Sequence, residues 1–181
     1  AYIIACFGDP GLLAARELTS APVLGIAEAA MHAASFIATS FSIVTTLDRT
    51  RVIAEALVRN YGMKDFCRRV RATDIPVLDL EDASDRVNDI IFAECQRAVG
   101  EDRSGAIVLG CAGMAGLVDY LKPRLPVPVI DGVTVAVKFA EALVGAGLRT
   151  SKHGDLGYPL AKPYRGQTAR FSPLNALSDG I

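Results

Sequence analysis

Two cysteines stand in the same local sequence frame in distant parts of the chain. Residues 6–12 read CFGDPGL and residues 111–117 read CAGMAGL, so both follow the pattern C-x-G-x-x-G-L. A thiolate can remove a proton and a thiol can donate one. Two thiols on opposite sides of one small molecule could therefore move a proton from one face of a carbon atom to the other. Cys6 and Cys111 predict chemistry of this kind, a stereoinversion.

Both cysteines stand where a predicted strand gives way to a glycine-containing loop and then to a helical pattern. Ligands of a parallel sheet bind outside the carboxyl ends of its strands. The partial positive charge of a helix N-terminus favours a thiolate, and glycines allow backbone N–H groups to point at an anion. A Pro-Val pair follows each frame, at residues 22–23 and 128–129, which indicates a repeated strand–loop–helix–strand unit. We therefore expect two similar half-sites.

A buried structural role is the usual interpretation of a single cysteine in an apolar segment. The duplicated frame favours a functional role for Cys6 and Cys111, whereas Cys67 and Cys95 lack the frame and are expected to be packing residues. The four cysteines match neither a disulfide framework nor a zinc-binding spacing, and the sequence has no C-x-x-C pair. We expect no metal site.

A thiol hydrolase is one alternative for a reactive cysteine, and it needs a histidine positioned beside the thiol. His32 lies on a predicted helix and His153 in an irregular segment, and neither has a distinctive local frame. We expect packing or surface roles for both. A non-catalytic site for phosphate or another small anion is a further alternative. Residues 110–116 lack the G-x-G-x-x-G order and the P-loop lysine that such a site would favour.

The composition of the 181-residue chain favours an α/β fold. Hydrophobic residues make up 51% and the mean hydropathy is +0.31, as expected when strands are covered on both faces. A net charge of −1 without a basic run argues against nucleic-acid binding. Uninterrupted apolar segments are all shorter than the roughly 18 residues of a membrane span. A charged signal-peptide region is missing and the cysteine pattern suits a reducing compartment, so we expect a cytoplasmic protein.

Short apolar runs alternate with helical patterns along the chain. We expect strands at residues 2–6, 23–26, 42–46, 69–72, 106–110 and 127–130. We expect helices at residues 12–18, 27–38, 49–61, 84–99, 116–125 and 133–144. This alternation predicts an α/β class with mostly parallel sheets covered by helices. The helix at 49–61 has apolar residues at the spacing of one buried face, and they are Val52, Ile53, Ala56, Leu57 and Tyr61.

Both ends of the chain are unusual. The sequence begins AYII, without Met and directly inside a predicted strand, so we expect further residues upstream. Residues 150–181 combine glycines and prolines with aromatic residues. We expect that segment to be irregular chain that packs across the surface or against another subunit. We also expect the protein to be a homo-oligomer.

Five segments of the sequence resemble one family. They are residues 5–12 ACFGDPGL, 25–31 GIAEAAM, 41–46 FSIVTT, 110–114 GCAGM and 128–133 PVIDGV. Taken in order, these segments resemble the aspartate/glutamate/hydantoin racemase superfamily, most closely the hydantoin racemases, with the allantoin racemases beside them. The resemblance covers nearly the whole chain. The strand and Asn-Pro-Asn-like loop with which the family usually opens have no counterpart in this sequence.

The resemblance implies a fold of two pseudo-symmetric α/β domains with the active site in the cleft between them. It also implies that no metal or cofactor is used. In the family the chain crosses back after the second domain, so we assign residues 1–40 plus 134–181 to the first domain and residues 41–133 to the second. Each domain would then contribute one catalytic cysteine.

The resemblance assigns the roles of catalytic acid and base to Cys6 and Cys111. It also implies that loop amides bind substrate oxygens, at Phe7, Gly8, Ala112 and Gly113. Family members hold substrate with hydroxyl groups at the end of the strand at 42–46, so Thr45 and Thr46 are predicted substrate-binding residues. The structural alternative for both is that threonine is common in strands.

The substrate that this resemblance favours is a small cyclic ureide. The carbon to be inverted in a 5-substituted hydantoin lies next to a ring carbonyl, so loss of its proton gives an enolate that N–H groups can stabilise. Allantoin is the alternative substrate on the same fold. Residues 112–114 read AGM in place of the Thr-His-containing frame of aspartate and glutamate racemases, which favours a neutral ring over a carboxylate. Asp9 and Asp131 suit loop starts and helix caps, and we expect structural roles for both.

Overall fold

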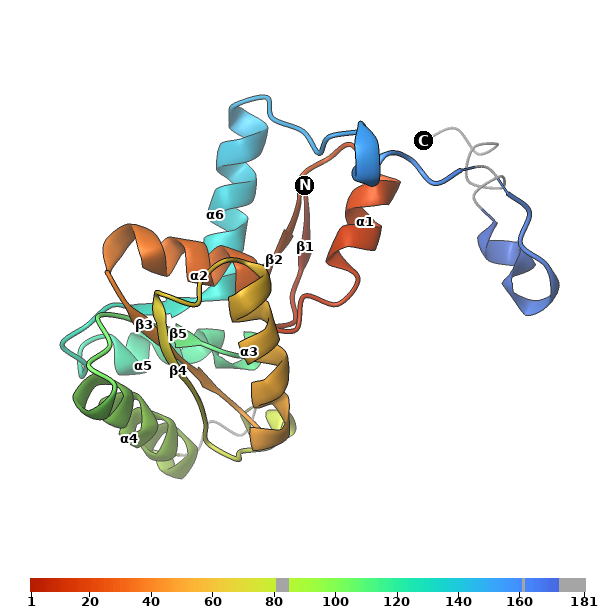
Figure 1. Cartoon of the computed structure of the whole chain (residues 1–181). Helices are drawn as coiled ribbons and strands as arrows, with labels where there is room; N and C mark the ends of the chain where they lie inside the picture. Colours follow the sequence, from red (N-terminus) through yellow and green to blue (C-terminus); the bar gives the residue numbers. More distant parts are fainter. Residues whose placement is uncertain (81–84, 161, 173–181) are drawn as a thin grey trace.

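Two parallel β-sheets and the helices that cover them form the computed structural model, which describes residues 1–80, 85–160 and 162–172 (Figure 1). The strands are β1 (Tyr2–Ile4), β2 (Val23–Gly25), β3 (Phe41–Thr45), β4 (Cys67–Ala72), β5 (Ile107–Leu109) and β6 (Val129–Asp131). The α-helices are α1 (Leu12–Leu18), α2 (Ile26–Ile37), α3 (Arg51–Asn60), α4 (Asp85–Glu101), α5 (Val118–Leu121) and α6 (Gly132–Gly145). Short 3₁₀ helices are η1 (Asp48–Thr50), η2 (Val77–Leu80), η3 (Ala112–Leu117), η4 (Gly154–Leu156) and η5 (Gly166–Phe171).

Every strand pairing within the described residues is parallel. β1 pairs with β2, and the second sheet has the order β4-β3-β5-β6. At the centre of the second sheet, Val44 of β3 lies beside Arg71 of β4 and Leu109 of β5. The predicted α/β class with parallel sheets covered by helices is confirmed. Because neighbouring strands run in the same direction, the ends of β3 and β5 open at one edge of the sheet.

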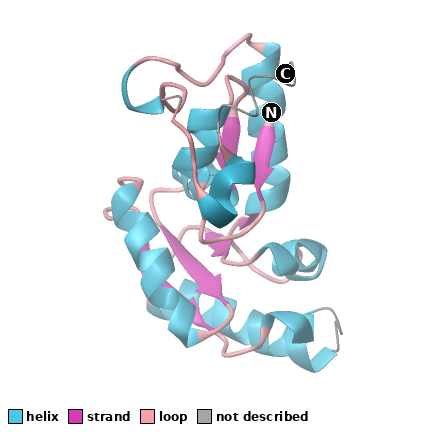
Figure 2. Ribbon diagram, turned by 90° about the vertical axis from the view of Figure 1, so that its right-hand side faces the viewer, coloured by secondary structure: helices cyan, strands magenta, loops and turns pink. Residues whose placement is uncertain are grey.

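The second sheet separates two apolar cores, because alternate residues of a strand point to opposite faces. In the first core, Phe41, Ile43 and Val108 pack with buried residues of α2, α3 and α6. In the second core, on the other face of the sheet, Val44 and Leu109 pack with α4, α5 and η3. Figure 2 shows helices flanking the strands of both sheets. Strands β2, β3 and β5 are buried along their whole length, which agrees with the high apolar content of the sequence.

Helices α2 and α6 pack against each other and join the two sheets. A Cβ on Gly132 at the start of α6 would lie 2.3 Å from the carbonyl oxygen of Ile26, so only glycine permits this approach of the helix ends. The two sheets fall in different predicted domains: β1 and β2 lie in residues 1–40 plus 134–181, and β3 to β6 lie in residues 41–133. Both predicted domains contribute residues to the core around α2 and α6. That division stays a prediction.

The expected helix at residues 116–125 is confirmed only in part. The chain forms the 3₁₀ helix η3 directly after Cys111 and only one turn of α-helix, α5. Gly113 and Gly116 weaken the α-helical preference of this segment, and a 3₁₀ turn leaves Met114 fully buried in the second core. After Cys111 the chain therefore forms a tight 3₁₀ turn, where the sequence pattern indicated a glycine-containing loop and then a longer helix.

The expected buried face of the helix at 49–61 is also partly wrong. In α3 the buried side chains are Ala54 and Val58, whereas Val52 and Ile53 are 63% and 48% exposed. Helix α3 packs on the first core through the face that carries the small Ala54. Ile53 instead lines a pocket. Core packing therefore does not explain why this position of α3 carries an apolar side chain.

Residues 150–160 and 162–172 continue the chain beyond α6 as irregular structure with two short 3₁₀ helices, as expected. The N–H of Thr150 donates to the carbonyl of Ser20 at 2.9 Å, and the Lys152 ammonium donates to the carbonyl of Arg16, so this segment lies along α1. The chain then runs away from the sheets to η5 (Figure 1). Over the described ranges, no helix combines the length and the apolar character needed to cross a membrane.

Candidate active site

A pocket of about 320 Å³ lies where β1, β3 and β5 end, and both cysteine loops open onto it. The eight residues predicted for the site all line this pocket. They are Cys6, Phe7, Gly8, Thr45, Thr46, Cys111, Ala112 and Gly113. A larger groove of about 440 Å³ between α1, α2 and α6 contains none of them. The fold brings the predicted residues together, while their chemical roles remain predictions.

The loop after Cys6 is held in place by Asp9. The N–H of Asp9 donates to the carbonyl of Cys6 at 2.9 Å, and Asp9 has a left-handed backbone with a φ of 43°. Its carboxylate accepts hydrogen bonds from the N–H groups of Ala27 (3.1 Å) and Glu28 (3.0 Å) in the first turn of α2. The Tyr61 hydroxyl donates a third hydrogen bond at 2.8 Å. Asp9 is thus a helix cap supplied by a distant loop, in agreement with the structural role expected for it.

The contact between Asp9 and α2 is enclosed. A Cβ on Gly25 would lie 2.2 Å from Cγ of Asp9, so glycine is required to leave room for the carboxylate. Burial raises the pKa of Asp9, although its three hydrogen bonds act in the opposite direction. Burial, followed by the hydrogen bond to Asp9, raises the pKa of Tyr61, so the phenol remains a donor. The loop that carries Cys6 is fixed to the start of α2 by these contacts.

Cys111 is half-buried between the end of β5 and η3. Burial raises the pKa of its thiol, hydrogen bonds from the N–H groups of Gly113 and Met114 lower it, and the charge of Cys6 raises it. The net direction is upward. Because charge on one thiol opposes ionisation of the other, a state with two thiolates is disfavoured.

The two threonines at the end of β3 differ in their contacts, although each is only 3% exposed. The Thr45 hydroxyl donates to the carbonyl of Gly110 at 3.0 Å, which ties β3 to the residue before Cys111. For Thr46, no side-chain hydrogen bond is present among the residues that the structure describes. The hydroxyl of Thr46 is therefore the freer of the two for a ligand.

Sequence reasoning missed several residues of the pocket wall. They are Ala5, Thr50, Ile53, Ala54, Val77 and Gly110. Ile53 is missed because helical periodicity indicates an apolar face without saying what that face contacts. Val77 follows β4 at the same sheet edge as the loops after β3 and β5, and that position is a signal that could have identified it.

One family matches most of the sequence: residues 1–140 fit the family model for Asp/Glu/hydantoin racemases. The chain belongs to this family. It is therefore a racemase, an enzyme of the isomerase class, and the resemblance drawn from the five sequence segments is confirmed.

Relatives of this racemase include proteins named for two cyclic substrates. The hydantoin racemase of Rhizobium meliloti is 52% identical over 166 residues, which cover 92% of this chain and 69% of the relative. An allantoin racemase structure from Klebsiella pneumoniae has a TM-score of 0.90 at 57% identity, over 94% of this chain and 70% of that one. A glutamate racemase from Bacillus anthracis has a TM-score of 0.58 at 21% identity, over 81% of this chain and 58% of that one, which shows the fold alone. These alignments agree with the α/β racemase fold expected from the sequence.

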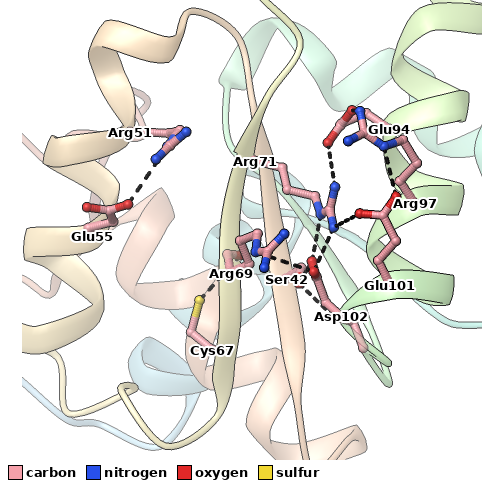
Figure 3. Close-up of polar contacts among 11 residues, drawn as sticks. Ser42, Arg51, Glu55, Cys67, Arg69, Arg71, Glu94, Arg97, Glu101 and Asp102 are labelled. Carbon is pink, nitrogen blue, oxygen red and sulfur yellow. Dashed lines mark hydrogen bonds and ion pairs between the residues drawn. The ribbon is translucent and has the colours of Figure 1, made fainter.

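The racemase also has a buried ionic cluster away from the pocket (Figure 3). The guanidinium of Arg71 donates to Asp102 at 2.6 Å, and it also reaches Glu94 and Glu101 on α4, at 2.9 and 2.7 Å. The Ser42 hydroxyl donates to Asp102 at 2.9 Å. Burial would raise the pKa of Asp102, but its hydrogen bonds and the charge of Arg71 outweigh burial and hold the pKa below the ordinary value. The cluster fastens α4 to β3 and β4, which is a structural role.

The remaining two cysteines have the environment of packing residues. Burial raises the pKa of Cys67 and that of Cys95 to about 12. A thiol with such a pKa is almost wholly protonated near neutral pH and is a poor base. Cys95 is fully buried in the second core, and Cys67 lies on the edge strand β4 with its Sγ 3.7 Å from the carbonyl oxygen of Arg69. Both agree with the packing roles expected from the sequence.

Proposed function

We propose that this racemase inverts the stereocentre of 5-substituted hydantoins, with Cys6 and Cys111 as its acid/base pair. One observation carries the proposal: the two thiols line a single pocket although they follow strands of different sheets. The 52% identity to the hydantoin racemase of Rhizobium meliloti supports the substrate class.

The proposed reaction moves one proton across the C5 atom of the hydantoin ring. The thiolate of one cysteine takes the C5 proton, and the C–H electron pair moves into the ring and onto the carbonyl oxygen to form a planar enolate. The thiol of the opposite cysteine then donates its proton to the other face of C5. The first cysteine ends as a thiol and the second as a thiolate. The enzyme is regenerated with the two protonation states exchanged, ready for the opposite enantiomer.

Backbone N–H groups of the two loops stabilise the enolate oxygen in this proposal. Gly113 lines the pocket beside Cys111, so its N–H is a candidate donor to this oxygen. A donor aimed at developing negative charge is worth about 3 kcal/mol in a water-excluded site. The other groups to which we assign substrate contact are the amides of Phe7, Gly8 and Ala112 and the hydroxyls of Thr45 and Thr46.

Allantoin is the second candidate substrate, because the allantoin racemase structure from Klebsiella pneumoniae is 57% identical to this chain. Allantoin carries a polar ureido group at the position where alkyl and aryl hydantoins are apolar. The apolar side chains of Ile53 and Val77 in the pocket favour the alkyl or aryl group. Initial rates for allantoin and 5-benzylhydantoin, measured side by side, decide between the two substrates.

The test of the proposed function uses an optically pure 5-alkylhydantoin in heavy water with the full-length protein. We expect optical rotation to decay and deuterium to appear at C5, both faster than in the same buffer without enzyme. Deuterium at C5 is expected because the donating thiol exchanges its proton with solvent before the transfer. A constant optical rotation with no deuterium uptake would reject the proposal.

Three features of the whole protein belong to the proposal as well. The domain division at residues 40/41 and 133/134 is supported by the two sheets, which lie on either side of it. The cytoplasmic location and the homo-oligomeric state rest on the sequence expectations. Size-exclusion chromatography with light scattering measures the oligomeric state directly, and a monomer at assay concentrations would contradict it.

A further inference from the structure

We propose that Ile53 and Val77 form the wall that receives the apolar substituent at C5 and so set the substituent preference of the enzyme. This inference rests on the proposed racemase function of the pocket. Both residues line the pocket that contains the two cysteines. Both are large and apolar, yet Ile53 is 48% and Val77 46% exposed. Apolar side chains that line a pocket in this way are typical of ligand contact.

Ile53 lies beside the Cys6 loop. It belongs to the first turn of α3, and a Cβ on Gly8 would be 3.7 Å from Cγ2 of Ile53 and 3.9 Å from Sγ of Cys6. The missing side chain at Gly8 therefore leaves open the space between Ile53 and the thiol. A substituent of the substrate could occupy that space in van der Waals contact with Ile53.

Val77 lies on the side of the Cys111 loop. It begins the 3₁₀ helix η2, whose last residue, Leu80, packs against that loop: a Cβ on Gly113 would be 3.1 Å from Cδ1 of Leu80 and 3.7 Å from Sγ of Cys111. The contact fixes η2 relative to the second thiol. Each thiol therefore has an apolar element next to it, α3 beside Cys6 and η2 beside Cys111.

The geometry of the enolate explains why the substituent should reach these residues. In the enolate, C5 and its three neighbours lie in one plane, and the two thiols must stand above and below that plane. Two of the neighbours are ring atoms, and the ring's polar edge needs the N–H donors of the loops. The substituent is the third neighbour, so it leaves the ring in the plane between the thiols. Ile53 and Val77 supply the apolar surface on that side.

The experiment compares substrates with and without a substituent. Unsubstituted hydantoin has two hydrogens at C5, and its deuterium uptake reports proton abstraction without any contact to the wall. In the variants Ile53→Ala and Val77→Ala we expect kcat/KM for 5-isobutylhydantoin to fall roughly tenfold, in the range that missing methylene contacts produce. We expect deuterium uptake by unsubstituted hydantoin to fall far less, so the ratio of the two rates changes.

The chain offers a matched control for each variant. Val52 is adjacent to Ile53 on α3 and is 63% exposed, and Leu78 is adjacent to Val77 on η2 and is 75% exposed. Neither lines the pocket. We expect Val52→Ala and Leu78→Ala to leave the ratio of the two substrates unchanged. Circular dichroism verifies folding, and Ile53→Val replaces Ile53→Ala if the larger truncation does not fold.

The outcomes separate this inference from the proposed function. An unchanged substrate ratio in Ile53→Ala and Val77→Ala would overturn the wall assignment, and so would an equal loss on both substrates. A wild-type protein that exchanges deuterium into neither hydantoin would instead overturn the proposed function. A selective loss with 5-isobutylhydantoin, absent from the two control variants, supports the assignment.

Discussion

The two cysteine loops share one sequence frame but are anchored in opposite ways. The fourth position of the frame is Asp9 in the first loop and Met114 in the second. The carboxylate of Asp9 accepts hydrogen bonds from the start of α2, whereas Met114 is fully buried among apolar side chains of the second core. The first loop is therefore held by polar contacts and the second by packing. The two loops therefore share the position of the thiol in the sequence frame, but different contacts hold each loop in place.

This difference makes the two thiols unequal. Cys6 is exposed and is followed by an open turn in which Gly11 has a φ of 70°, before α1 begins at Leu12. Cys111 is half-buried at the start of η3, and burial raises the pKa of its thiol. In the two-thiol mechanism proposed above, the raised pKa of Cys111 favours its protonated form.

The largest expected effect comes from removing either thiol. We expect Cys6→Ser and Cys111→Ser each to lower the racemisation rate about 10³-fold, because a serine hydroxyl is a far weaker acid and base than a thiol. Each variant retains one thiol on one face, so it should still exchange the C5 proton of one enantiomer. Deuterium uptake by each pure enantiomer, followed by NMR, measures this one-sided exchange.

Cys67→Ser is the matched control for the thiol variants, because burial keeps the Cys67 thiol protonated and Cys67 lies outside the pocket. We expect its racemisation rate to stay within twofold of the wild type. Full activity toward both enantiomers in Cys111→Ser would show that the two-thiol mechanism is wrong.

The next largest effect tests the two anchors. Met114→Ala should lower the free energy of unfolding by about 2–5 kcal/mol, because it leaves a cavity in the second core. Asp9→Ala should cost only about 0.5–2 kcal/mol, the usual value of a helix cap. Urea denaturation followed by circular dichroism gives both values, and Leu13→Ala at a 64% exposed position serves as the control. A larger loss for Asp9→Ala than for Met114→Ala would contradict the assignment of a packed anchor to the second loop.

A smaller effect is expected in the reactivity of the thiols. At pH 7.5 we expect iodoacetamide to label Cys6 about tenfold faster than Cys111, because Cys6 is exposed and the raised pKa of Cys111 lowers its thiolate fraction. In Cys6→Ser the charge that raises the pKa of Cys111 is absent, so Cys111 should react faster than in the wild type. Peptide mass spectrometry measures both rates. Equal labelling rates for Cys6 and Cys111 would contradict the expected difference in reactivity between the two thiols.

Much of the site could be predicted because its signals are local. Cys6 and Cys111 each follow an apolar run and precede glycines, and the parallel arrangement then brings strand ends to one pocket. The 3₁₀ turn after Cys111 could not be predicted from the pattern, because it depends on how Met114 packs in the core. The position of Ile53 in the pocket could not be predicted either, because core-facing and pocket-facing residues share the same helical spacing. The cap by Asp9 joins residues distant in sequence, which no local pattern reports.

The smallest effect concerns the pH dependence that Asp9 contributes. Its pKa in the folded protein is raised above the ordinary value of 3.8, so the folded chain holds the proton more tightly than the unfolded chain. This contribution stabilises the fold at pH values below 3.8 and is lost as the pH rises through the folded pKa. The variant Asp9→Asn cannot titrate, so its unfolding free energy should decline less than that of the wild type between pH 4 and pH 7. Urea denaturation at several pH values measures the difference, and parallel curves for the two proteins would show that Asp9 titrates alike in both states. In that case the hydrogen bonds that Asp9 accepts would fully offset the effect of burial on its pKa. The carboxylate would then hold the Cys6 loop without a net cost of desolvation.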